Sequence, residues 1–145
     1  EENLQAVGRL DADTSGLLLF TNDTVFAARI TGSSSGVEKV YEARISGSLD
    51  PRHARAFESG ILLDGQLTLP ARVRILETDE TCTRVEITLT EGRNRQIRRM
   101  WEALGHEVLD LERKRIGPIS LGDLRPGEVR AVTEFERATL QVPER

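Results

Sequence analysis

The chain has 145 residues, a length that suits one domain with its own hydrophobic core. Hydrophobic residues make up 38% of it and charged residues 30%, and the net charge of −4 does not by itself indicate a nucleic-acid-binding protein. No apolar run approaches the roughly 20 residues of a membrane span, and the first residues do not resemble a signal peptide. The single cysteine, Cys82, excludes an internal disulfide and a cysteine-rich zinc site, so we expect a cytoplasmic protein that does not enter the membrane.

Residues 8–23, GRLDADTSGLLLFTND, place two acids, Asp11 and Asp13, in a short loop between Gly8 and Gly16. An isolated loop of this kind is most often a turn with an Asx hydrogen bond. Its spacing is close to the phosphatase loop D-x-D-x-T, but the threonine comes one residue early, and a calcium site needs more regularly spaced oxygen ligands. The loop alone therefore leaves open a turn, a metal or phosphate site, and a catalytic acid.

The segments that follow predict a strand, a helix and a loop. Residues 17–20 are apolar and predict a short buried strand, after which one of the polar residues 21–23 can cap a helix. That helix carries Phe26 and Ile30 on one face. Residues 31–36, rich in glycine and serine, predict a flexible loop.

An alternating segment, residues 37–47, predicts a half-buried strand. Tyr41, Ala43 and Ile45 face one way, and the charged residues between them face the other. On this pattern alone, Tyr41 is equally well read as an ordinary core tyrosine.

The middle of the chain predicts one helix and two strands. Asp50 followed by Pro51 predicts a helix start, and Gly60 predicts its end. Residues 71–76 and 84–90 alternate in polarity and predict strands, and the short link between them favours antiparallel pairing.

A possible capping box, formed by Thr133 and Glu136, predicts a short last helix. Strands and helices interleave along the chain, with short connections and no internal repeat. We therefore predict the α+β fold class, with a mixed, mostly antiparallel sheet and helices packed on it.

A helix that ends at Gly105 is predicted from apolar residues spaced i, i+3, i+4 and i+7, which are Ile97, Met100, Trp101 and Leu104. This stripe faces the core, so Trp101 is predicted as a core residue and not as a platform for base stacking. His106, just after the helix, is predicted at the surface.

Basic residues cluster on the same segment. Arg95 and Arg99 lie opposite the stripe and one turn apart, where like charges repel by roughly a few tenths of a kcal/mol unless an anion such as an RNA phosphate offsets them. Arg98 lies at the flank of the stripe, where a guanidinium needs a carboxylate partner. A solvated helix face is the simpler interpretation of such a charge run, and a face that binds a polyanion is the alternative.

Four segments, in chain order, together resemble the motifs of the bacterial ribosomal pseudouridine synthases of the small-subunit type, a family that includes several large-subunit enzymes. The segments are the loop segment 8–23, VEKVY at 37–41, EGRNRQIRRMWEALGH at 91–106, and RIGPISLGDLRPGEVR at 115–130. The resemblance covers nearly the whole chain, and four motifs in the right order are far more specific than any one of them.

This resemblance implies a role for individual residues. Asp11 matches the catalytic aspartate, Tyr41 the aromatic residue that packs against the target base, and Arg98 the basic residue that pairs with the aspartate. Leu111 matches an apolar residue of the uracil pocket, and Asp13 is left as a residue that orders the loop. The other basic residues near these motifs are assigned to RNA binding: Arg9, Arg93, Arg95 and Arg99.

The chemistry that the resemblance implies suits these residue types. Uridine is isomerised when its base leaves the ribose through N1 and rejoins through C5, so we expect no cofactor and no metal. Asp11 could act as a nucleophile or as a base at the sugar, and Arg98 beside it would favour its charged form. The uridine must flip out of its stack, and a ring such as that of Tyr41 could then stack on it for roughly 1–3 kcal/mol.

The resemblance also sets expectations for the whole chain. Residues 1–145 should form the catalytic domain, without the N-terminal strand region and the separate RNA-binding domain that family members often carry. The loop after Ile30 should be shorter than the family's His-Pro-Ser loop. We expect a monomer whose partner is ribosomal RNA, and the run RNRQIRRMWEA favours the large subunit. The alternatives are small-subunit RNA and a noncatalytic RNA-binding module.

Overall fold

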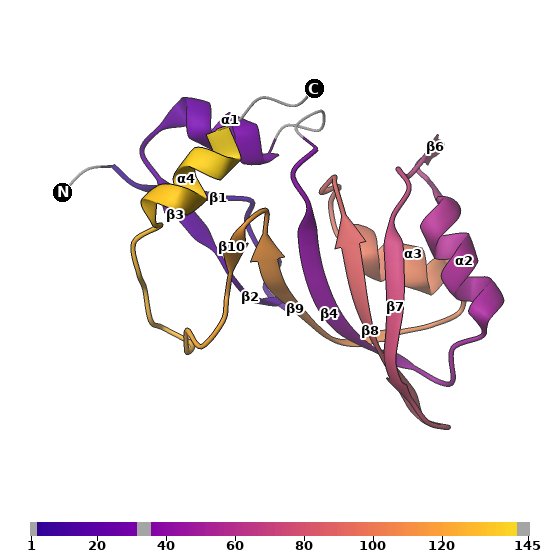
Figure 1. Cartoon of the computed structure of the whole chain (residues 1–145). Helices are drawn as coiled ribbons and strands as arrows, with labels where there is room; N and C mark the ends of the chain where they lie inside the picture. Colours follow the sequence, from indigo (N-terminus) through magenta and orange to yellow (C-terminus); the bar gives the residue numbers. More distant parts are fainter. Residues whose placement is uncertain (1–2, 32–35, 142–145) are drawn as a thin grey trace.

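A central sheet organises the computed structural model, which describes residues 3–31 and 36–141 (Figure 1). The strand order is β10–β9–β4–β8–β7, all neighbours being antiparallel, and β2 pairs with β9 in parallel. The strands of this sheet are β2 (Ser15–Gly16), β4 (Lys39–Ser46), β7 (Arg72–Thr78), β8 (Cys82–Leu89), β9 (Val108–Ile116) and β10 (Ile119–Ser120). The predicted α+β class with a mixed, mostly antiparallel sheet is confirmed.

The central strand β4 alternates as predicted. Ala43 and Ile45 are buried in the core, and Tyr41 on the same face is half-buried against it. The opposite face carries charged residues that pair across strands, such as Arg44, whose Nε donates to Asp110 Oδ2 at 2.8 Å on β9. One face of the sheet is thus left for the core and the site.

Two helices and part of the sheet enclose the larger core. The helices are α2 (Pro51–Ser59) and α3 (Gln96–Ala103); in Figure 1, α3 passes behind β8 and β7, and α2 lies beside β7. The rings of Phe57 and Trp101 stack with their centroids 4.4 Å apart, and Met100 is fully buried beside them. The prediction that Trp101 is a core residue is confirmed.

A second, smaller core lies at the other end of the sheet (Figure 1). It is enclosed by α1 (Thr24–Thr31), α4 (Glu134–Gln141) and a two-stranded pair, β1 (Gln5–Val7) with β3 (Leu19–Thr21). Phe26, Ile30 and Leu140 from the two helices pack there with Ile116 of β9. The segment between β1 and β3 therefore runs beside β9, where the two cores meet.

Helix caps explain where several elements begin. Asp23 caps α1, because its Oδ1 accepts the backbone N–H groups of residues 25 and 26 at 3.0 and 3.1 Å. Asp50 caps α2 in the same way at 2.8 Å, and the helix ends at Gly60. Thr133 and Glu136 form the predicted capping box, with reciprocal bonds of 3.1 and 2.9 Å.

The expected strand at residues 17–20 is only partly right. Leu17 and Leu19 are buried, but β3 begins at Leu19, and Phe20, which points to the opposite face from Leu19, is 54% exposed. Most of the predicted loop 31–36 lies outside the described residues.

His106 is not the surface residue that the sequence suggested. The chain turns back after α3, so the ring meets the edge of Trp101 with centroids 5.7 Å apart. Its Nδ1 lies 2.7 Å from the carbonyl oxygen of Ser46, and its Nε2 lies 3.2 Å from Nδ1 of His53. The half-buried imidazole therefore helps to close the end of the larger core.

A small hairpin, β5 (Leu62–Leu63) with β6 (Gln66–Leu67), links α2 to β7. Asp64 and Gly65 form its turn with positive φ values of 52° and 77°. None of the helices in the described part of the chain is long and apolar enough to cross a membrane.

Candidate active site

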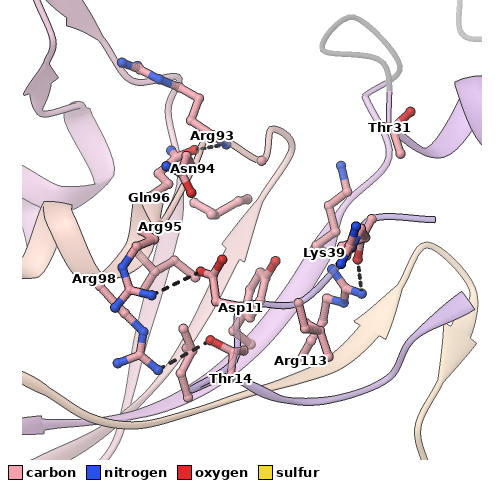
Figure 2. A pocket seen from close by; sticks show the side chains of 18 of the residues that line it. Asp11, Thr14, Thr31, Lys39, Arg93, Asn94, Arg95, Gln96, Arg98 and Arg113 are labelled. Atoms are coloured by element: carbon pink, nitrogen blue, oxygen red, sulfur yellow. Dashed lines mark hydrogen bonds and ion pairs between the residues drawn. The ribbon is translucent and has the colours of Figure 1, made fainter. Parts of the chain in front are cut away.

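A cavity of about 250 Å³ opens where the loop between β1 and β2 faces the start of α3 across β4 and β9 (Figure 2). Of the described residues that line it, Asp11 is the one acid. Its cationic lining residues are Arg9, Lys39, Arg93, Arg95, Arg98 and Arg113. A single carboxylate among several cations, in a chain of net charge −4, marks this cavity as a candidate site for an anionic substrate.

The loop that carries Asp11 is fixed at both ends to β9. Arg113 donates from Nη2 to the carbonyl of Gly8 and from Nε to the carbonyl of Leu17 at 3.0 Å. Gly16 has φ 118° and lies so close to β9 that a Cβ on it would sit 2.3 Å from the carbonyl oxygen of Arg113. The Thr14 N–H also donates to the Asp11 carbonyl at 3.0 Å, so the loop is a turn as well as a candidate site.

Arg95 joins this loop to α3. It is the residue before the first turn of the helix and has a left-handed backbone, with φ 51°. Its guanidinium makes a bidentate contact with Asp13, at 3.1 and 2.9 Å, and its Nη1 lies 3.8 Å from Asp11 Oδ2. Hydrogen bonding from Arg95 lowers the pKa of Asp13 below its usual value.

Arg98 has a different partner from the one expected. Its Nε lies 3.4 Å from Asp13 Oδ1, and its Nη2 donates to the backbone carbonyl of Asp13 and to Thr14 Oγ1 at 3.4 Å. The predicted pair of Arg98 with Asp11 is therefore wrong in this structure. The reason is that α3 begins at Gln96, so Arg95 lies outside the helix and takes the place nearest Asp11.

The remaining helix arginines contact the β5–β6 hairpin. Arg93 donates to the carbonyls of Leu63 and Gln66 at 2.7 and 3.2 Å and still lines the cavity. Arg99 pairs with Asp64, at 2.8 Å between Nη2 and Oδ2. It is not among the described residues that line the cavity. The repulsion expected between Arg95 and Arg99 is thus offset by protein carboxylates, and Arg99 is the one predicted site residue that the structure does not bring to the cavity.

Tyr41 and Leu111 belong to the apolar part of the lining, together with Leu10, Ile30, Leu89 and Ile97. They lie on the adjacent strands β4 and β9, where Tyr41 is opposite Arg113 and Leu111 is opposite Ala43. Tyr41 is half-buried and packs against the larger core, while Leu111 is buried within it. The carboxylate of Asp11 and an aromatic side chain therefore share one cavity, as the motif order predicted.

Sequence reasoning missed Lys39 and Arg113. Both line the cavity, and both are buried, with 7% and 3% of their surface exposed. The signal was present in the alternation: Lys39 lies two residues before Tyr41, and Arg113 two residues after Leu111, so each is a cation on the inward face of its strand.

Residues 3–31 and 36–141 contain no group of three or more histidine, cysteine, aspartate or glutamate side chains that could hold a metal ion.

Comparison with known proteins gives these features a family context. Residues 1–103 match the sequence profile of a family described as RNA pseudouridylate synthase. The chain is 39% identical over 137 residues to the ribosomal large subunit pseudouridine synthase B of Bacillus subtilis, an alignment that covers 93% of this chain and 56% of that protein. It is 40% identical over 142 residues to the ribosomal small subunit pseudouridine synthase A of Vibrio cholerae, covering 96% and 60%.

A solved structure gives the same relation. A crystal structure of a pseudouridylate synthase superimposes with a TM-score of 0.87 at 38% identity, over 94% of this chain and 59% of that one. The chain thus spans a little more than half the length of the curated relatives that it matches.

Proposed function

Because the chain belongs to the RNA pseudouridylate synthase family, we propose that it isomerises a uridine of ribosomal RNA to pseudouridine, with Asp11 as the catalytic carboxylate. The observation that carries the proposal is the position of Asp11, the one acid among the described residues of a cavity that is otherwise cationic and partly apolar. Such a cavity suits a nucleotide, whose phosphates are anionic and whose base has an aromatic face.

The residues around the cavity supply the steps that the isomerisation needs. The loop between Gly8 and Gly16 presents Asp11 to the base or the sugar of a flipped uridine, and Arg95, 3.8 Å away, favours its charged form. Tyr41 stacks on the extruded base, and Leu111 lines the pocket for the ring. Atoms balance without a co-substrate, because the C1′–N1 bond is replaced by a C1′–C5 bond and the proton of C5 is exchanged for one on N1.

The arginines hold this arrangement and attract the RNA. Arg98 and Arg95 fasten Asp13, and with it the loop, to the start of α3. Arg9 is exposed at the mouth of the cavity, where a phosphate of the RNA strand could reach it. We propose that the protein acts in the cytoplasm on large-subunit RNA, since the run RNRQIRRMWEA favours that subunit. Small-subunit RNA is the alternative, because relatives named for either subunit are nearly equally similar.

A map of pseudouridines in ribosomal RNA tests the activity and the target together. RNA from cells that lack the protein would be compared with RNA from cells that express it and from cells that express the Asp11→Asn variant. We expect at least one pseudouridine in large-subunit RNA to be missing from the first and third samples. A loss in small-subunit RNA would support the alternative target, and identical maps from all three samples would contradict the proposed activity.

A further inference from the structure

Lys39 is a buried cation whose ammonium group has no hydrogen-bond or ion-pair partner among the described residues. It lies at the start of β4, opposite Leu89 of β8 and Ile116 of β9, and only 7% of its surface is exposed. The side chain of Lys39 makes no hydrogen bond or ion pair with any residue in the described ranges 3–31 and 36–141, although the charge of Glu91 acts on it. The acid that faces it, Glu91, already accepts from the Leu69 N–H at 2.7 Å and from the Gln96 side chain at 2.9 Å. Lys39 lines the cavity (Figure 2), and no residue in the part of the chain that the structure describes accepts a hydrogen bond from its ammonium group.

A second buried cation makes the position of Lys39 more costly. Arg113 is only 3% exposed, and its Nε and Nη2 donate to the backbone carbonyls of Gly8 and Leu17, which neutralise no charge. Burial, and then the charge of Arg113, lower the pKa of Lys39 below its usual value. Two like charges with little access to water favour a bound anion that satisfies both.

Apart from the exposed Arg9, the other cations of the cavity already have partners among the described residues. Arg95 is held by Asp13, and Arg98 by Asp13 and Thr14, while Arg93 donates to two carbonyls of the β5–β6 hairpin. Figure 2 shows this separation: Arg95 and Arg98 lie on one side of Asp11, and Lys39 and Arg113 lie on the other. The buried positive charge of the cavity is thus concentrated on β4 and β9, where Lys39 and Arg113 lie.

We infer that Lys39 and Arg113 form a phosphate subsite, which holds a phosphodiester of the substrate strand next to the uridine that Asp11 acts on. The inference rests on the proposed function for the identity of the strand, but the subsite is defined by its charge and burial alone. Lys39 supplies the free donors and Arg113 supplies charge behind them. In this arrangement the phosphate fixes the nucleotide on one side of Asp11, so that the base is directed toward Tyr41.

The experiment compares three small probes: uridine, uridine 5′-monophosphate and uridine 3′-monophosphate. Their dissociation constants would be measured by titration against the unmodified protein and the Lys39→Met variant, which keeps the length and apolar stem of the side chain. We expect one of the two monophosphates to bind the unmodified protein about tenfold more tightly than uridine, the gain of one charge-assisted contact. That preference should disappear in Lys39→Met and return in Lys39→Arg.

A matched control distinguishes an effect of Lys39 itself from the effect of removing any one positive charge. Lys114→Met removes a half-exposed lysine of β9 that pairs with Glu112 at 3.2 Å outside the cavity, and it should keep the full preference. Equal binding of all three probes by the unmodified protein, or a preference that survives in Lys39→Met, would overturn the subsite. A Lys39-dependent preference without any pseudouridine formation would instead retain the subsite and reject the proposed reaction, so the two failures can be told apart.

Discussion

Asp13, and not Asp11, is the residue that fastens the candidate catalytic loop to α3. Its carboxylate contacts Arg95 and Arg98, while Asp11 is left at 3.8 Å from Arg95 and faces the cavity. This division suits the chemistry, because a carboxylate tied up by two guanidinium groups has few lone pairs left for a substrate. The sequence showed two acids in one loop, but only the fold shows which of them the arginines occupy.

A double-mutant cycle tests this division at the scale of single residues. Asp13→Asn and Arg95→Gln should each lower the free energy of unfolding, and together they should cost less than the sum. We expect a small coupling, since the two side chains are 50% and 44% exposed and solvent screens such pairs. The same cycle for Asp11 and Arg98 should show a smaller coupling. Urea denaturation supplies all the values, and a larger coupling for Asp11 with Arg98 would restore the pairing that the resemblance implied.

At the scale of elements, the pairing of β2 with β9 depends on a glycine. A Cβ on Gly16 would lie 2.3 and 2.4 Å from the backbone oxygen and nitrogen of Arg113, atoms that cannot move without breaking the strand pair. Gly16→Ala should therefore cost more than about 1 kcal/mol of stability and displace the Asp11 loop. The control is Gly47→Ala, whose φ of 78° is also left-handed but whose Cβ would meet no atom within 4 Å. Equal loss of stability and activity in both variants would show that close contact with β9 is unimportant.

The capping box of α4 should make the stability of the folded protein depend on pH. Hydrogen bonds from the side chain of Arg130 and from the backbone of Thr133 lower the pKa of Glu136 to about 2, against 4.5 for an unperturbed glutamate. A carboxylate with a depressed pKa in the folded state contributes stability above its unfolded pKa, and that contribution is lost as pH falls from about 4.5 toward 2. Glu136→Ala should thus destabilise the protein by about 1 kcal/mol or less at pH 7, because solvent screens the pair with Arg130, and the difference from the unmodified protein should shrink below pH 4.5. Thermal melts across this range measure it, and a difference independent of pH would contradict the role of the charged form.

At the scale of the whole molecule, periodic patterns predicted the elements better than they predicted the site. Alternation over residues 37–47 and the stripe around Trp101 gave the strand, the helix and the buried faces, because each depends on neighbours a few residues away. The site depends on contacts between distant segments, such as Arg95 with Asp13, which no local pattern records. Arg95 is an example: the sequence placed it on the helix face opposite the apolar stripe, but α3 begins at Gln96, and Arg95, just before the helix, contacts Asp13 of the loop.

The distribution of charge over the molecule also becomes clear only in the folded structure. The net charge of −4 hides a cationic cavity, because the acids are spread over the outer face of the sheet and the helix ends. Arg99 shows that a basic residue in a matching motif need not line the cavity, since it forms an ion pair with Asp64 instead. Cations on the inward face of a strand, such as Lys39, indicate the cavity better than cations on a helix surface. A lysine is rarely buried without a partner, whereas an exposed arginine is common.

The proposed isomerisation depends on one carboxylate, that of Asp11, so its most direct test is the release of tritium from RNA labelled at C5 of uridine. Asp11→Asn keeps the shape of the side chain but removes its charge and its nucleophilic oxygen. Asp64→Asn is the matched control, because asparagine tolerates the left-handed backbone of that residue, which lies outside the cavity. We predict that Asp11→Asn binds RNA with nearly unchanged affinity and releases no tritium above background, while Asp64→Asn releases it at close to the unmodified rate. Tritium release by Asp11→Asn at the unmodified rate would contradict the central claim.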